Sequence, residues 1–140
     1  MSNRDKTIEA AGLLFHKQGF RDTSAEQIID ACDVSKSNFY YHFESKEALG
    51  FAVLEKWIEG YDHHILQNVF RDVTFPPQEK IEKFFDKLAG LIEKRGGRLG
   101  CPFGNLALEM SDVHEGFRSR LGRFFDEWAG ALEDCLEEGK

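Results

Sequence analysis

One segment near the N-terminus, Thr23–Glu47, constrains the fold of this chain more than any other. It reads as two short amphipathic helices joined by a tight turn, followed by the start of a third helix. Thr23 and Glu26 fit a capping box for the first of these helices. Asp33 follows where a left-handed residue is needed to end that helix. Ser35 is placed to cap the second helix and Ser45 to cap the third. The segment therefore predicts a helix-turn-helix.

The second helix of this motif carries side chains suited to duplex DNA. Phe39 and Phe43 lie four residues apart and anchor one face of the helix to the core. On the free faces, lysine can donate to a guanine edge and asparagine can pair with adenine. The residues predicted to face the bases are Lys36, Ser37, Asn38 and Tyr41.

Phosphate oxygens suit a different set of donors, namely hydroxyl, imidazole and ammonium groups and the free N–H groups of a helix start. The residues predicted to hold phosphates are Thr23, Ser24, Tyr40, His42 and Lys46. For any one of these residues an ordinary surface role is an equal alternative. The whole set at this spacing favours DNA binding.

A specific pattern of residues surrounds this motif. Its members are Ile8-Glu9-Ala10-Ala11, Phe15, Gly19-Phe20, Thr23-Ser24, Ile28-Ile29, Val34-Ser35-Lys36-Ser37-Asn38-Phe39-Tyr40-Tyr41-His42-Phe43 and Ser45-Lys46-Glu47-Ala48-Leu49. The pattern resembles the DNA-binding domain of the TetR family of bacterial transcriptional regulators and covers roughly the first third of the chain. The resemblance implies a regulatory domain that binds a small effector. It also implies a homodimer, because a palindromic operator needs two recognition helices about 34–36 Å apart. One departure is Asp33, where the family often has Gly.

Hydrophobic periodicity predicts helices along the rest of the chain, with no strand and no repeat. The predicted helices are Asn3–Gln18, Lys46 to about Val69, a helix through Ile81–Ile92 that ends near Arg95, Asn105–Met110, and about Asp112–Glu138 capped by Ser111 or Asp112. A break is predicted over residues 71–77, at Pro76-Pro77.

The predicted fold class is all-α. A three-helix DNA-binding domain with the helix-turn-helix occupies residues 1–47, and a helical ligand-binding and dimerisation domain occupies residues 48–140. The resemblance implies two further long helices that would form a four-helix dimer interface, so the chain is C-terminally short against the family pattern. We expect either a shortened chain or a dimer that forms in another way.

Composition narrows the classes of function. The net charge of −7 and the pI of about 5.2 argue against general nucleic-acid binding, so specificity must come from local placement of charge. Three cysteines without a C-x-x-C pair indicate neither a disulfide framework nor a zinc site. No stretch is apolar enough to span a membrane, and we expect a cytoplasmic protein without a metal or cofactor.

Aromatic residues in the second part of the chain are candidates for an apolar effector cavity. The tentative ligand-binding residues are Trp57, Tyr61, Phe84, Phe85, Cys101, Phe103, Met110 and Trp128. Candidate polar anchors are His63, His64, Asn105 and Glu109. For any given residue, a packed core is the more common alternative.

Cys101 stands apart from the other two cysteines. It lies between Gly100 and Pro102 in a predicted loop, whereas Cys32 and Cys135 fall on apolar helix faces. The run from Gly100 to Leu106 resembles a motif in one branch of the family, some of whose members sense electrophiles or oxidants through a cysteine. Nearby arginines and a helix start favour the reactive thiolate. A structural or pocket-lining cysteine is the alternative.

Three classes of function compete. The first is a ligand-responsive transcriptional regulator, a repressor released from double-stranded DNA by a small apolar or electrophilic effector. The second is a helical protein–protein interaction module that has lost DNA binding, which the acidic balance favours and the intact DNA-facing set opposes. The third is an enzyme, which we do not expect, because no catalytic triad order, metal-ligand cluster or phosphate loop is present.

Overall fold

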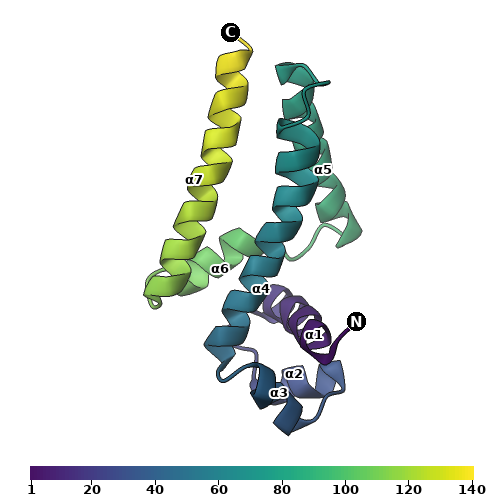
Figure 1. The fold of residues 1–140 in the computed structure, drawn as a ribbon, viewed down its shortest axis with the longest axis vertical. Helices are drawn as coiled ribbons and strands as arrows, with labels where there is room; N and C mark the ends of the chain where they lie inside the picture. Colours follow the sequence, from purple (N-terminus) through teal and green to yellow (C-terminus); the bar gives the residue numbers. More distant parts are fainter.

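The computed structural model describes residues 1–140, and every regular element in it is a helix (Figure 1). In chain order these are α1 (Asn3–Gln18), α2 (Ala25–Cys32), α3 (Lys36–His42), α4 (Lys46–Tyr61), η1 (Asp62–Phe70), α5 (Pro77–Lys94), α6 (Pro102–Met110) and α7 (Glu115–Glu138). The predicted all-α class is confirmed. No helix is both long and apolar enough to cross a membrane.

Helices α1 to α3 form the lower end of the molecule in Figure 1, and their ends are set by local caps. Asp33 ends α2 in the left-handed conformation, at φ 54° and ψ 47°, as predicted. Ser35 and Ser45 cap α3 and α4, also as predicted. The predicted cap of α2 is one residue early: Ser24 and Gln27 form the capping box instead of Thr23 and Glu26. Thr23 cannot cap because its side chain is only 1% exposed and its hydroxyl donates to the Gly19 carbonyl.

The helix that follows the helix-turn-helix continues from Lys46 to Phe70 without a break, close to the predicted end at Val69. Its second part differs from the prediction, since η1 from Asp62 to Phe70 is a π-helix. Wider π turns are uncommon and occur often at functional sites. Figure 1 shows α4 and η1 as one long diagonal, with α5 on one side and α7 on the other.

The other C-terminal helices begin at residues that favour a helix start, namely prolines in α5 and α6 and a capping histidine in α7. Pro77 and Pro102 occupy the first turns of α5 and α6, where a missing N–H costs nothing. This places the start of α6 three residues before the predicted Asn105. The predicted cap of α7 at Ser111 or Asp112 is wrong, because residues 111–113 form a turn. His114 caps α7 by accepting a hydrogen bond from the Phe117 N–H through Nδ1.

One hydrophobic core joins the N-terminal helices to α6 and α7. It runs from Phe39 in α3 through Leu49 in α4 to Phe117 and Phe124 in α7. A second, smaller cluster of Ile65, Val69 and Phe84 joins η1 to α5, with Trp128 and Leu132 of α7 packed against it. The α1–α2 loop takes part in this shared core, since the Phe20 ring packs edge-on against Phe117 of α7 with 5.3 Å between ring centroids.

Candidate nucleic-acid interface and effector sites

Helix α3 presents an exposed polar face away from its aromatic anchors. Phe39 and Phe43 are buried, which fixes the orientation of the helix. Lys36, Ser37 and Tyr40 are exposed, and Tyr41 is 82% exposed. The exposed Tyr41 side chain can present both its ring and its hydroxyl to a binding partner.

Asn38 and His42 lie at the margins of that face. Both residues are half-buried. The Asn38 Oδ1 atom is buried without a hydrogen-bond partner, so a rotation of its side chain toward DNA would break no hydrogen bond of that atom. The His42 ring packs edge-on against Tyr41, with 5.0 Å between ring centroids. Asn38 and His42 are therefore less accessible on α3 than Lys36 and Tyr41 are.

The residues predicted to hold phosphates fall into two groups. Tyr40 and Ser24 are exposed, and the Ser24 hydroxyl is engaged as the cap of α2. Thr23 and Lys46 instead face the protein. The Lys46 ammonium donates to the Phe20 carbonyl at 3.0 Å and to the Thr23 carbonyl at 3.2 Å. It also lies 4.5 Å from the centroid of the Phe20 ring, so its observed contacts hold the α1–α2 loop.

Most of the aromatic residues predicted to line an effector cavity pack against one another. The Phe103 and Phe124 rings stack at 4.3 Å, and Tyr61 contacts both rings edge-on. Phe84 and Met110 are buried, while Trp57, Tyr61 and Trp128 are half-buried. Phe85 does not join them, because it is 60% exposed on the outer face of α5.

Unsatisfied polar atoms mark the junction of α4, η1 and α7. The Tyr61 hydroxyl, the Asp62 Oδ1 atom and the Trp128 Nε1 atom are buried without hydrogen-bond partners. Burial, followed by the nearby Asp62 charge, raises the pKa of the Tyr61 hydroxyl and keeps it a neutral donor. Buried polar groups are normally paired with protein groups or ordered water, so these three atoms have unused hydrogen-bonding capacity.

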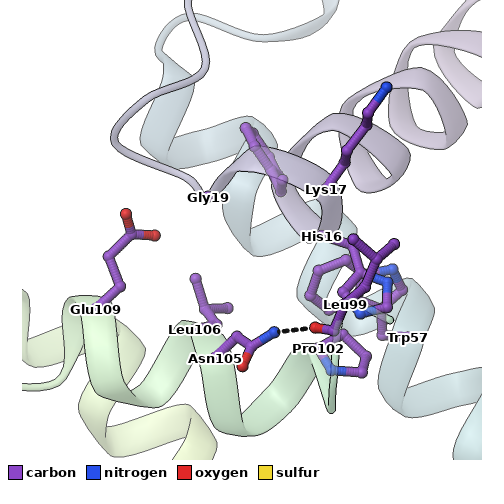
Figure 2. Close-up of a pocket in the computed structure, with 10 residues that line it drawn as sticks. His16, Lys17, Gly19, Trp57, Leu99, Pro102, Asn105, Leu106 and Glu109 are labelled. Carbon is purple, nitrogen blue, oxygen red and sulfur yellow. Dashed lines mark hydrogen bonds between the residues drawn. The ribbon is translucent and has the colours of Figure 1, made fainter. Parts of the chain in front are cut away.

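Two hollows lie between helices of the structure. One, of about 350 Å³, lies between η1, α5 and α7 and includes Arg71, Lys80 and Cys135 in its wall. The other, of about 290 Å³, lies between α1 and α6 (Figure 2). Of the tentative ligand residues, only Trp57 lines either hollow.

Two predicted polar anchors do line the hollow between α1 and α6. Glu109 projects from α6 toward the end of α1 and the Asn105 amide donates to the Leu99 carbonyl, while His63 and His64 are exposed on η1. Sequence reasoning did not single out His16, whose Nε2 atom lies 3.0 Å from the Gly100 carbonyl. The two residues are 84 positions apart in the sequence, so no local pattern predicts the contact.

Cys101 occupies the N-cap position of α6, directly after the carbonyl that His16 contacts. Its side chain is exposed, and its Sγ atom accepts from the Gly104 N–H at 3.5 Å. Arg95 donates to the Gly100 carbonyl at 3.3 Å, which brings a positive charge to the same loop. Cys32 and Cys135 are buried, and burial raises the pKa of the Cys135 thiol. The structure thus separates one accessible thiol from two protected ones.

Two segments of the chain match known protein families. Residues 8–53 match the bacterial regulatory proteins of the tetR family, and residues 77–140 match the C-terminal domain of LmrA/YxaF-like transcriptional regulators. The transcriptional repressor DhaR of Mycobacterium sp. (strain GP1) is 31% identical over 137 residues, covering 98% of this chain and 67% of DhaR. The repressor NemR of Escherichia coli (strain K12) is 25% identical over 137 residues, covering 98% of this chain and 68% of NemR.

Solved structures agree on the fold. The regulatory protein TetR from Rhodobacter sphaeroides superposes with a TM-score of 0.85 at 25% identity, covering 96% of this chain and 70% of the other. The reduced form of E. coli NemR superposes with a TM-score of 0.87 at 24% identity, covering 99% and 72%. The chain spans about two-thirds of the length of these relatives. Because both segments match this family's models and DhaR is 31% identical, the chain belongs to the TetR family of bacterial transcriptional regulators.

Proposed function

We propose that this protein is a ligand-responsive repressor that binds a palindromic operator as a homodimer and is released by a small effector. The observation that carries the proposal is the α3 surface, where Lys36, Ser37 and Tyr41 are exposed together beside buried aromatic anchors. DhaR and NemR are both named transcriptional repressors. We assign operator binding to residues 1–47 and effector binding and dimerisation to residues 48–140.

Base reading is assigned to Lys36, Ser37, Asn38 and Tyr41. The experiment selects an operator from randomised duplexes with the wild-type protein and then measures the affinity of an Asn38→Ala variant for the operator and its single-base variants. We expect a loss of discrimination at particular base pairs worth about 1–3 kcal/mol. An equal loss of affinity for operator and random DNA would contradict base reading by Asn38.

Phosphate contacts are assigned first to the exposed residues Ser24 and Tyr40, with His42 at the margin. Thr23 and Lys46 act in this proposal through the loop that they hold, because their polar atoms are already engaged by backbone groups. A Tyr40→Phe variant removes one hydroxyl and leaves the ring in place. We expect it to weaken operator and random duplexes by the same factor.

Release by an effector is proposed to act through the regulatory helices, and two kinds of effector fit. An electrophile would modify Cys101, the exposed thiol at the start of α6. A small apolar molecule would open the aromatic cluster around Tyr61, Phe103 and Trp128, where the unpaired hydroxyl and indole N–H provide polar anchors.

Limited alkylation with N-ethylmaleimide distinguishes these two effectors. If Cys101 is the sensor, mass mapping should find it modified well before Cys32 and Cys135, with operator affinity falling in step. A Cys101→Ser variant should keep operator binding and lose the response. Release of DNA while Cys101 stays unmodified would exclude the thiol switch and leave the apolar effector as the better account.

A further inference from the structure

The short loop that joins α1 to α2 is held by two side chains of opposite charge from two different helices. The Lys46 ammonium at the start of α4 binds the carbonyl oxygens of Phe20 and Thr23. The Glu109 carboxylate near the end of α6 accepts from the backbone N–H groups of Phe20 and Arg21. A positive group thus holds the acceptors of the loop, and a negative group holds its donors.

The Glu109 contact is specific in its geometry. Oε1 lies 2.7 Å from the Phe20 nitrogen and Oε2 lies 3.2 Å from the Arg21 nitrogen, so each carboxylate oxygen serves one N–H. Hydrogen bonds to an ionised acceptor are about twice as strong as neutral ones. Figure 2 shows Glu109 projecting from α6 toward the backbone near Gly19.

The backbone conformation of Gly19 leaves space for the Glu109 carboxylate. Its φ of 94° ends α1 in a conformation that side chains rarely adopt. A Cβ atom added there would lie 3.1 Å from the Glu109 Oε2 atom. The backbone at the end of α1 therefore leaves room for the carboxylate to reach the next two amides.

The loop also leads directly into the helix-turn-helix. Ser24 caps the start of α2, and α2 and α3 share the buried core with α1 through Ile28 and Phe39. Two hydrogen bonds to Glu109 link α6 to this loop, and both fix backbone N–H groups of the loop. The position of α6 is thereby tied to the orientation of the DNA-binding surface.

We infer that Glu109 is a positioning residue for operator binding, because its carboxylate fixes the angle at which the helix-turn-helix sits on the regulatory domain. The inference rests on the proposed operator binding by a homodimer. It assigns to α6, whose N-cap is Cys101, the contact through which the regulatory domain holds the recognition helix in place. Fixing that angle matters for a palindrome, since two recognition helices must keep one spacing.

Hydrogen exchange tests the clamp without DNA. In the full chain, a Glu109→Ala variant should exchange the Phe20 and Arg21 amide protons about tenfold faster than wild type or more, the scale expected for loss of a charge-assisted hydrogen bond. A Glu109→Gln variant keeps one acceptor oxygen, so it should retain protection at one amide and lose it at the other. The matched control is Leu108→Ala, on the same turn of α6, whose side chain is 90% exposed. Unchanged exchange in Glu109→Ala would overturn the clamp.

Operator binding then tests the positioning role, using a selected palindrome and a duplex that carries one half-site. Glu109→Ala should bind the palindrome about tenfold more weakly, because fewer molecules have the competent spacing. Its affinity for the single half-site should stay within about twofold of wild type, since the α3 surface itself is unchanged. Leu108→Ala should match wild type on both duplexes.

The outcomes separate this inference from the proposed function. Equal weakening on palindrome and half-site would overturn positioning and indicate local damage to the motif. Unaltered palindrome binding together with faster amide exchange would also overturn it. If the wild-type protein bound neither duplex above the level of random DNA, the proposed function would fail, while faster exchange in Glu109→Ala would still establish the clamp.

Discussion

Gly50 of α4 offers a sharp test of how tightly the DNA-binding helices pack on α7. A Cβ atom added at Gly50 would lie 2.7 Å from Phe20 Cε2 and 2.8 Å from Phe117 Cζ, far inside the usual carbon–carbon separation of about 3.5–4.0 Å. Both rings are buried and lie in edge contact, with centroids 5.3 Å apart. Gly60 lies in the same helix, and an added Cβ there meets nothing within 4 Å.

These contacts set the expected magnitudes. Replacing an interior helix glycine with alanine favours the helix by about 1 kcal/mol, so Gly60→Ala should stabilise the protein by about that amount. Gly50→Ala gains the same propensity but loses about 1–3 kcal/mol to overpacking. The two variants should therefore differ by about 1–3 kcal/mol in unfolding free energy, measured by urea denaturation followed by far-UV circular dichroism.

A second substitution checks the cause of that difference. Phe117→Leu in the Gly50→Ala background should restore part of the lost stability, because it removes one of the two rings that the new methyl group meets. Equal stability of Gly50→Ala and Gly60→Ala would refute the reasoning and show that the Phe20 and Phe117 rings move aside without cost.

Three further predictions follow from individual contacts. Lys46→Met should lower the unfolding free energy by about 1–3 kcal/mol and leave the slope of log K against log salt unchanged, whereas loss of a phosphate contact would reduce that slope by about 1. Asp33→Gly should increase the unfolding free energy by about 0.5–1 kcal/mol and so raise the melting temperature, because glycine adopts the left-handed conformation at no steric cost. The hydrogen bond and charge of Arg120 lower the pKa of Glu55 from 4.5, so this pair stabilises the fold at neutral pH and stops doing so as acid protonates Glu55. Glu55→Gln should cost at most about 1 kcal/mol at pH 7 and flatten the decline in stability below pH 4.5, as an acid series of urea titrations would show.

Local signals in the sequence account for most of the helix-turn-helix. The left-handed Asp33 and the caps Ser35 and Ser45 follow from nearest-neighbour chemistry, and the structure confirms them. The cap of α2 was misplaced by one residue, because Thr23 and Ser24 are both good capping residues and only burial distinguishes them. Periodicity likewise predicted the length of the α4–η1 helix but not the π-helical geometry of its second part, which depends on packing.

Contacts between distant parts of the chain were beyond local reasoning. Lys46 looks like a phosphate ligand in sequence, yet its ammonium binds carbonyls 23 and 26 residues earlier. Glu109 was predicted only as a weak ligand anchor, because nothing near it indicates a bond to the Phe20 amide 89 residues away. Phe85 fits the apolar stripe of α5 by spacing but lies on the outer side of the helix. In each case the tertiary arrangement decides what the side chain meets.

The central claim is that the α3 surface reads a specific duplex, and the most direct measurement is a salt titration of binding to the region upstream of the gene that encodes this protein. The account predicts an affinity for that region far above the affinity for shuffled DNA of equal length, with log K falling linearly as log salt rises. Given the net charge of −7, binding to shuffled DNA should be weak at physiological salt. Equal and weak affinity for both duplexes at every salt concentration would contradict the account and favour an interaction module that has kept the fold without binding an operator.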